Sequence, residues 1–176
     1  MRKLVESTFM TLDGVINDPQ NWSPPYWDEE HAAYSSALLF ASDALLLGRK
    51  TYEGFAATWP TRSGDEFTDR INAMPKYVAS RTLENPTWNA SVLEGDVPEA
   101  VAALKAEDGA NLLKYGTGSL SKTLLEHRLV DEYHFWIFPV LAGSGVRLFE
   151  GAEASLDLVD TTRFGSGIVV HKYTPK

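Results

Sequence analysis

The segment that most constrains the fold is a short apolar run that ends in two closely spaced glycines and continues as a helical pattern. Leu112 to Tyr115 is apolar enough for a buried strand, and the leucines from Leu120 to Leu125 recur at helical spacing. Gly116 and Gly118 lie between them, and glycine adopts backbone angles closed to other residues and lets a ligand approach the main chain. The first N–H groups of a helix have no partner within it, so this strand-turn-helix unit predicts an anion site that a pyrophosphate would fit.

The same Gly-x-Gly pattern also serves ordinary tight turns, so the motif alone leaves both interpretations open. The third glycine of the dinucleotide fingerprint is missing, and no acidic residue stands clearly at the end of a following strand. A standard Rossmann domain is therefore disfavoured.

Two other predicted strands also end in polar turns. Ala44 to Leu47 is a continuous apolar run, as in a parallel strand buried on both faces, and Gly48-Arg49-Lys50-Thr51 follows it. Lys76 to Ala79 is the next strand, and Ser80-Arg81-Thr82 follows that one. Cations at a helix start oppose the helix dipole, which makes sense if an anion lies between them, although a solvated basic pair would give the same pattern.

Open α/β sheets bind their ligands at the carboxyl ends of the strands. We therefore expect the three turns to meet on one rim and to hold a ribose phosphate, an adenine edge and a pyrophosphate. The extra cations favour an adenine dinucleotide with a 2′-phosphate.

The remaining segments predict one α/β domain over residues 1–176. Further strands are expected at 3–12, 91–93, 133–138, 156–163 and 168–173, and helices near 28–41, 65–74, 97–107 and 119–127. The last two strands are joined through Phe164 to Gly167 and predict an antiparallel hairpin. The sheet should begin parallel and end antiparallel.

The first strand runs into an acidic turn and an irregular loop. Asp13-Gly14 is a turn pair, and Asp13 would either act chemically or fix the turn through its backbone. The loop from Asn17 to Tyr26 is rich in proline and aromatic residues, and Trp22, Tyr26 and Trp27 are expected to fold over something. Asp28 stands at the next helix start, where dipole compensation is the alternative to a functional role.

Composition excludes several classes of function. The net charge is −8 over 176 residues with no run of lysine or arginine, so nucleic acid is an unexpected partner. Cysteine is absent, and the four histidines are scattered without ligand spacing, so no metal site is predicted. No Gly-x-Ser-x-Gly elbow and no membrane span occur, and we expect a soluble cytoplasmic protein.

The order and spacing of these motifs resemble the dihydrofolate reductase-like superfamily, and within it the C-terminal reductase domain of the bifunctional riboflavin biosynthesis deaminase/reductase. The likeness covers nearly the whole chain. The residues that carry it are Met10 to Gly14, Leu47 to Tyr52, Ser80 to Thr82, Gly116 to Leu120, Leu129 to Glu132, Pro139 to Gly145 and Arg147 to Phe149.

This resemblance implies a three-layer fold, with a mixed, mostly parallel sheet between helices, that binds NADPH and delivers hydride to a small heterocyclic substrate. It places Arg49, Lys50 and Thr51 at the 2′-phosphate, with help from the turn at Ser80, Arg81 and Thr82 beyond the neighbouring strand. It places the turn formed by Gly116, Thr117, Gly118, Ser119 and Leu120 at the pyrophosphate, Gly48 at the start of the basic turn, and Ile16 beside the nicotinamide. Asp13 and Asp28 are the acids to consider as proton donor or substrate anchor.

Two departures from that family keep alternatives open. The zinc-binding deaminase half is missing, and the aromatic loop from Trp22 to Trp27 is unexpected for a phosphoribosyl substrate, which should recruit cations. The expected activity is that of a 5-amino-6-(5-phosphoribosylamino)uracil reductase, and the alternatives are a dihydrofolate or pterin reductase or a non-catalytic nucleotide-binding module. We also expect a homodimer, from the apolar strand at Tyr133 to Phe138 and the late hairpin.

Overall fold

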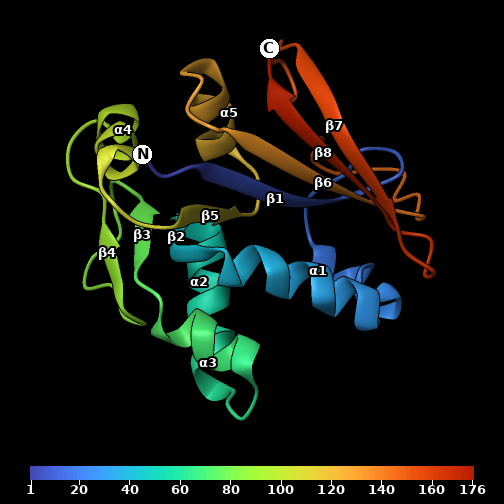
Figure 1. Ribbon diagram of the computed structural model, residues 1–176, viewed down its shortest axis with the longest axis horizontal. Helices are drawn as coiled ribbons and strands as arrows, with labels where there is room; N and C mark the ends of the chain where they lie inside the picture. The colour runs from blue at the N-terminus through green and yellow to red at the C-terminus, as the bar shows by residue number, and fades with distance from the viewer.

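A single mixed sheet of eight strands forms the centre of the protein in a computed structural model that describes residues 1–176 (Figure 1). The strand order is β4-β3-β2-β5-β1-β6-β8-β7. The strands from β4 to β6 run parallel, whereas β8 is antiparallel to both β6 and β7. Their bounds are β1 Leu4–Thr11, β2 Ser42–Gly48, β3 Lys76–Ala79, β4 Ala90–Val92, β5 Asn111–Tyr115, β6 Glu132–Phe138, β7 Leu156–Arg163 and β8 Val169–Pro175.

Helices cover both faces of this sheet and make three layers. Figure 1 shows α4 and α5 above the sheet and α1, α2 and α3 below it. The helices are α1 Glu29–Phe40, α2 Arg49–Thr58, α3 Glu66–Ala73, α4 Val97–Ala106 and α5 Ser119–Glu126, and short 3-10 turns span Pro19–Asn21, Pro24–Tyr26 and Trp59–Thr61. The predicted three-layer architecture with an antiparallel C-terminal hairpin is confirmed.

The strand β2 shows why its sequence is apolar without alternation. Ala44 and Leu46 face a core that Val101 of α4 and Leu124 of α5 complete. Leu45 and Leu47 face the opposite core, together with Leu39 of α1, Tyr52 of α2 and Ile71 of α3. A central parallel strand buries both faces, so every position along it needs an apolar side chain.

The aromatic loop after β1 covers the outer part of the α1 face. Trp22 and Tyr26 meet the ring of Phe138 edge-on at 5.2 and 5.9 Å between centroids. Trp22 and Tyr26 are partly buried, whereas Trp27 is 53% exposed, so the loop packs two of its three aromatic residues on the protein and leaves one in solvent. The strand β6 lies between β1 and β8 and is mostly buried, so it does not offer the apolar surface from which a homodimer was expected.

The exposed apolar side chains at the sheet edge belong to β7, at Leu158 and Val159. Its expected partner strand begins at Val169, one residue later than the sequence pattern suggested. None of the helices combines the length and the apolar character that a membrane crossing requires.

Candidate functional site

The three turns singled out in the sequence lie side by side in the structure, because β3, β2 and β5 are consecutive parallel strands. The guanidinium of Arg49 donates to the hydroxyl of Thr82, which joins the first two turns. Thr51 lies against Gly116, which joins the first turn to the third. We call these three segments, Gly48–Thr51, Ser80–Thr82 and Gly116–Leu120, the carboxyl rim.

Gly116 is the position on the carboxyl rim where only glycine fits. Its φ angle is +72°, and a Cβ atom there would collide with Oγ1 of Thr51. A side chain at this point would be strained and would also push the first turn away from the third. The glycine therefore sets how closely the two turns approach.

The turn after Gly116 presents a row of unused donors. The N–H groups of Thr117 through Ser121 donate to no backbone acceptor, and the first intrahelical bond of α5 is from Lys122 N to Gly118 O at 3.2 Å. Consecutive free amides at the start of a helix attract anions through both hydrogen bonding and the helix dipole. Leu120 contributes an amide, while its side chain packs on the core shared by α4 and α5.

The basic side of the carboxyl rim has free cations beside an internally bonded arginine. Arg49 donates to Glu53 at 2.7 Å in addition to Thr82, and its side chain is 46% exposed. Lys50 and Arg81 are exposed and make no ion pair. The Ser80 hydroxyl accepts the amides of Thr82 and Leu83 at 3.2 and 3.0 Å, so it shapes its turn.

A cavity of about 210 Å³ opens beside the glycine turn. It joins that turn to Ile16 from the loop after β1 and to the segment after β6. The lining residues are Ile16, Thr117, Gly118, Ser119, Lys122, Val146, Arg147, Phe149 and Glu150. Ile16, predicted to border the cofactor, thus lies in one cavity with the predicted pyrophosphate turn.

Sequence reasoning gave no role to two cations of this cavity, Lys122 and Arg147. Lys122 stands three residues after Ser119 in α5, so helical spacing alone could have placed it on the same side. Arg147 was part of the family resemblance, but its place depends on a contact between distant segments. Its guanidinium donates to the carbonyl of Asp13.

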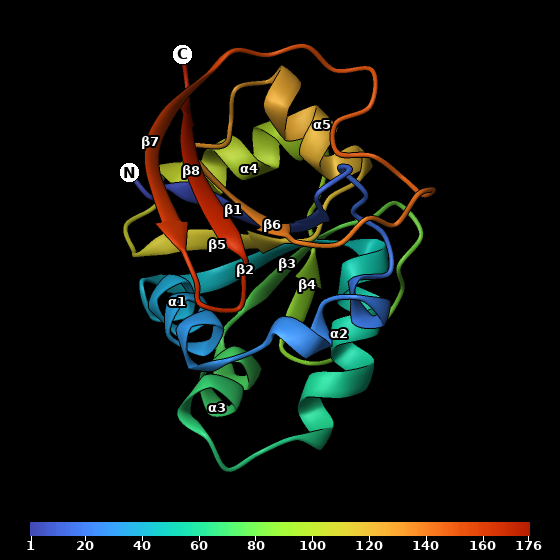
Figure 2. The ribbon, with the colours of Figure 1, turned by 90° about the vertical axis from the view of Figure 1, so that its right-hand side faces the viewer.

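The loop after β1 and the segment after β6 lie side by side and are tied together by many hydrogen bonds (Figures 1 and 2). Ile16 N donates to Val146 O at 2.9 Å, and Leu148 N donates to Gly14 O at 3.0 Å. Asn17 Oδ1 accepts the amide of Val146 at 2.7 Å. We call this paired region, residues 13–17 with 142–148, the loop clamp.

Asp13 is at the centre of the loop clamp. Its carboxylate accepts from the Thr11 hydroxyl at 2.5 Å and from the amides of Ala142 and Gly143 at 3.0 and 2.8 Å. These hydrogen bonds, that of Thr11 first, lower the pKa of Asp13 to about 2. An ionised carboxylate that accepts three hydrogen bonds is a poor proton donor. These contacts therefore favour the role of Asp13 in fixing the turn.

Asp28 lies outside the clamp at the start of α1. Its Oδ1 accepts the amide of His31 at 2.9 Å, which makes Asp28 the N-cap of the helix. The residue is exposed, and no hydrogen bond is made to its Oδ2. Dipole compensation and capping account for this acid, while one of its oxygens stays available.

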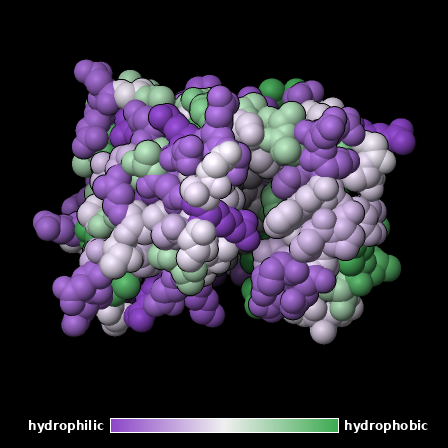
Figure 3. Space-filling model, turned by 90° about the horizontal axis from the view of Figure 1, so that it is seen from below, coloured by the Kyte–Doolittle hydropathy of each residue, from purple (hydrophilic) through white to green (hydrophobic).

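Aromatic side chains form the wall between α1 and the sheet. His31 stacks on Trp27 with centroids 5.5 Å apart and meets Phe9 and Trp136 at 5.6 and 5.0 Å. Burial lowers the pKa of His31, and its Nε2 is buried without a hydrogen-bond partner. Figure 3 shows the molecule from the side of α1, α2 and α3, with a narrow hollow near the middle in which hydrophobic residues are visible.

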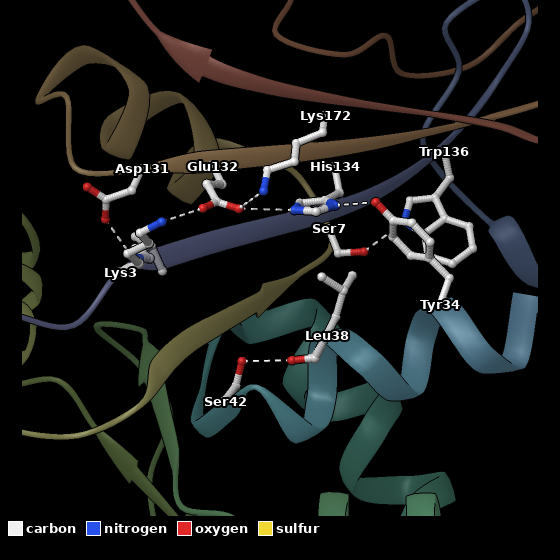
Figure 4. A network of polar contacts seen from close by, with 11 residues as sticks. Lys3, Ser7, Tyr34, Leu38, Ser42, Asp131, Glu132, His134, Trp136 and Lys172 are labelled. Carbon is white, nitrogen blue, oxygen red and sulfur yellow. Dashed lines mark hydrogen bonds and ion pairs between the residues drawn. The ribbon is translucent and has the colours of Figure 1, made fainter. Parts of the chain in front are cut away.

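Several polar contacts lie next to that wall, and one of them joins α1 to the sheet (Figure 4). The Tyr34 hydroxyl and Nδ1 of His134 share a hydrogen bond of 2.7 Å, and Trp136 Nε1 donates to Ser7 Oγ at 3.0 Å. Burial raises the pKa of Tyr34 to about 12 and lowers the pKa of His134. Both side chains are therefore neutral at pH 7. The Tyr34–His134 bond links the helix to the sheet, whereas the Trp136–Ser7 bond joins β6 to β1 within the sheet.

Comparison with known proteins places this arrangement in a family. The sequence model of the RibD C-terminal domain matches residues 2–170. The uncharacterized protein YyaP of Bacillus subtilis is 29% identical over 178 residues, which covers 96% of this chain and 92% of YyaP.

Two solved structures share the fold. A protein from Shewanella sp. PV-4 that has been assigned to riboflavin biosynthesis superposes with a TM-score of 0.75 at 23% identity, and the match covers 99% of both chains. A diaminohydroxyphosphoribosylaminopyrimidine deaminase/5-amino-6-(5-phosphoribosylamino)uracil reductase from Thermotoga maritima gives a TM-score of 0.68 at 17% identity. That match covers 99% of this chain and 57% of the Thermotoga chain. The chain belongs to the RibD C-terminal domain family, within the dihydrofolate reductase-like fold.

Proposed function

We propose that this chain is an NADPH-dependent reductase that transfers hydride to a small heterocyclic substrate. Its activity would be most like that of the 5-amino-6-(5-phosphoribosylamino)uracil reductase of riboflavin biosynthesis. The observation that carries the proposal is the meeting of three turns on one rim, where free amides and unpaired cations lie together. Membership of the RibD C-terminal domain family supports it.

The polar groups of the carboxyl rim fit the charged parts of NADPH. Arg49, Lys50 and Arg81 would hold the 2′-phosphate, with the hydroxyls of Ser80 and Thr82 beside them. The free amides from Thr117 to Leu120 would hold the pyrophosphate, and Lys122 and Arg147 would add positive charge to the same cavity. Thr51 would act through its packing on Gly116.

NADPH, when bound, would supply the hydride, and the protein's part is to align the reactants in a dry pocket. Ile16 would border the nicotinamide because it lines the cavity next to the glycine turn. The loop clamp holds Ile16 in place through its amide bond to Val146. Asp13 would serve as the positioning residue of this clamp.

Asp28 remains the acid to test as substrate anchor or proton donor. One of its oxygens is free, and it stands one helical turn before His31 of the aromatic wall. The wall would stack on a planar substrate, since aromatic rings favour offset or edge-to-face contact with other rings.

One observation favours the alternative of a dihydrofolate or pterin reductase. Between Lys3 and Arg49 the chain has no lysine or arginine, and this segment includes β1, the aromatic loop and α1. A phosphoribosyl group bound there would lack a cation from these elements. A planar substrate without phosphate would not need one.

A non-catalytic nucleotide-binding module would keep the carboxyl rim and show no turnover. Two measurements separate these functions. We expect NADPH to raise the unfolding temperature of the protein more than NADH does at the same concentration, because a ligand stabilises according to its occupancy. Equal protection by both cofactors would contradict the 2′-phosphate assignment. Oxidation of NADPH should then be followed with dihydrofolate, a pterin and the riboflavin-pathway aminouracil as substrates. Binding of NADPH without turnover of any of them would favour the binding module.

The same proposal takes residues 1–176 as a single reductase domain that works as a cytoplasmic homodimer. The sheet is continuous through all strands, which supports one domain. The exposed Leu158 and Val159 on the edge strand β7 give a surface that a second copy could cover. Light scattering should give a mass near twice the 19.5 kDa of one chain, and a monomer mass would contradict the dimer.

A further inference from the structure

A buried ion pair lies directly beneath the glycine turn, on the α5 side of the sheet. Glu6 of β1 and Lys114 of β5 are neighbours in the strand register, and their side chains are 0% and 2% exposed. Lys114 Nζ lies 3.6 Å from Glu6 Oε2. Burial lowers the pKa of Lys114, and the neighbouring Glu6 carboxylate opposes that shift.

The lysine of this pair bonds to the turn itself. Lys114 Nζ donates to the carbonyl of Gly116 at 2.5 Å and to the hydroxyl of Ser121 at 2.6 Å. Ser121, in the first turn of α5, donates in turn to Glu6 Oε1 at 2.8 Å. One ammonium group therefore fixes both the start of the glycine turn and the start of the helix.

Peptide geometry gives this contact a directional effect. The C=O and N–H groups of one trans peptide point in opposite directions. Because Lys114 holds the Gly116 carbonyl toward the protein interior, the N–H of Thr117 in the same peptide points the other way. Thr117 lines the cavity beside the turn, and its N–H has no backbone acceptor.

Net stability gives a weak reason for a charge at this position. Replacing a buried ion pair by apolar side chains of similar volume is often neutral or stabilising. The neighbours on this face, Leu4, Leu46 and Leu112, are apolar and would accept such a replacement. A lysine here makes more sense as the donor that orients the turn.

We propose that Lys114, held by Glu6 and Ser121, is a positioning residue that orients the amides from Thr117 onward toward the pyrophosphate of the cofactor. The inference rests on the proposed function, since it needs a pyrophosphate ligand at the glycine turn. It assigns the lysine no contact with that ligand.

The test compares two ligands that share one end. NADP⁺ has the 2′-phosphate and the pyrophosphate, whereas adenosine 2′-monophosphate has the 2′-phosphate alone. We expect Lys114→Met to weaken NADP⁺ binding about 10- to 100-fold, the loss that accompanies misplaced hydrogen bonds to a charged group. Affinity for adenosine 2′-monophosphate should stay within about twofold. Isothermal titration calorimetry measures both.

Two further variants guard against a folding defect. Glu6→Leu with Lys114→Met removes both charges, leaves no unpaired carboxylate and should show the same ligand-selective loss. Lys76→Met is the matched control, because Lys76 is also a fully buried lysine, and it donates to Asn72 O at 2.9 Å at the opposite end of its strand. It should leave the NADP⁺ affinity unchanged.

The outcomes separate the inference from the function beneath it. Wild-type protein that binds neither nucleotide would overturn the proposed function and this inference with it. Wild-type protein that binds NADP⁺, with a double variant that binds it equally well, would overturn the inference alone. Equal weakening of both ligands in the double variant would also overturn it, since that pattern indicates a general loss of structure.

Discussion

The two sides of the carboxyl edge of the sheet use their polar groups in opposite ways. On the side of β2, β3 and β5, the carboxyl rim leaves the amides from Thr117 to Leu120 and the cations of Lys50 and Arg81 without protein partners. On the side of β1, the loop clamp satisfies its groups internally, and Asp13 alone accepts three hydrogen bonds.

This difference separates the groups that can bind a ligand from the groups that fix the conformation of a loop. Exposed donors without partners are solvated in the free protein and can exchange water for a ligand, whereas a carboxylate that accepts several bonds is committed to its loop. Asp13, one of the two acids that the sequence suggested for a chemical role, thus lies on the side that fixes the shape of the site. The glycine turn has no reactive side chain, and its backbone amides lie on the side where donors have no protein partner.

The largest expected effect comes from breaking the carboxyl rim at its tightest point. Gly116→Ala should weaken NADPH binding by at least about 100-fold, because alanine is strained at this φ angle and its Cβ would displace Thr51. Titration calorimetry provides the measurement. Gly54→Ala is the control, since a Cβ at Gly54 in α2 meets nothing within 4 Å, and a Gly116→Ala protein with unchanged affinity would contradict the assignment of the turn.

A smaller, selective effect is expected from the free cations. Lys50→Gln should weaken NADPH binding about tenfold and leave NADH binding unchanged, because only NADPH has the 2′-phosphate. The ratio of the two affinities is the measurement. Arg163→Gln on β7 removes an exposed cation far from the rim and should change neither affinity, and a parallel loss for NADPH and NADH in Lys50→Gln would place this lysine elsewhere on the cofactor.

The smallest effect on chemistry is expected from the loop clamp. The Asp13→Asn protein should retain turnover at neutral pH. Its free energy of unfolding should depend less on pH in the acidic range than that of the wild-type protein. The pKa of Asp13 is lowered in the folded state to about 2, so its contribution is fully present above the unfolded value of about 3.9 and is lost as the pH falls toward 2. Urea unfolding between these pH values checks this, and a complete loss of turnover in a stably folded Asp13→Asn protein would instead make Asp13 a proton donor.

The sequence predicted well those features that depend on local pattern. The strand Lys76–Ala79 and the helix that begins at Ser119 were placed from apolar spacing and a glycine boundary, and the structure confirms both. The meeting of the three turns was also predictable, because parallel neighbours bring their carboxyl ends to one edge.

Contacts between distant segments were beyond such reasoning. Two of the three hydrogen-bond partners of Asp13 are the amides of Ala142 and Gly143, and nothing near Asp13 in the sequence reveals them. The sequence pattern placed Lys114 within an apolar strand and gave it no role. Its burial depends on the carboxylate of Glu6 in β1, which the local pattern around Lys114 does not reveal. Local pattern finds where a turn lies, while long-range packing decides which polar groups remain free.

The central position of β1 in the sheet has a consequence for how the nascent chain folds during translation. Leu4 pairs with Leu112, and Val5 pairs with Glu132, so the first strand made must wait for more than half of the polypeptide before either neighbour exists. Such non-local pairing slows folding and leaves an apolar edge open meanwhile. A ribosome stalled before β5 would therefore carry an unpaired strand that chaperones can bind.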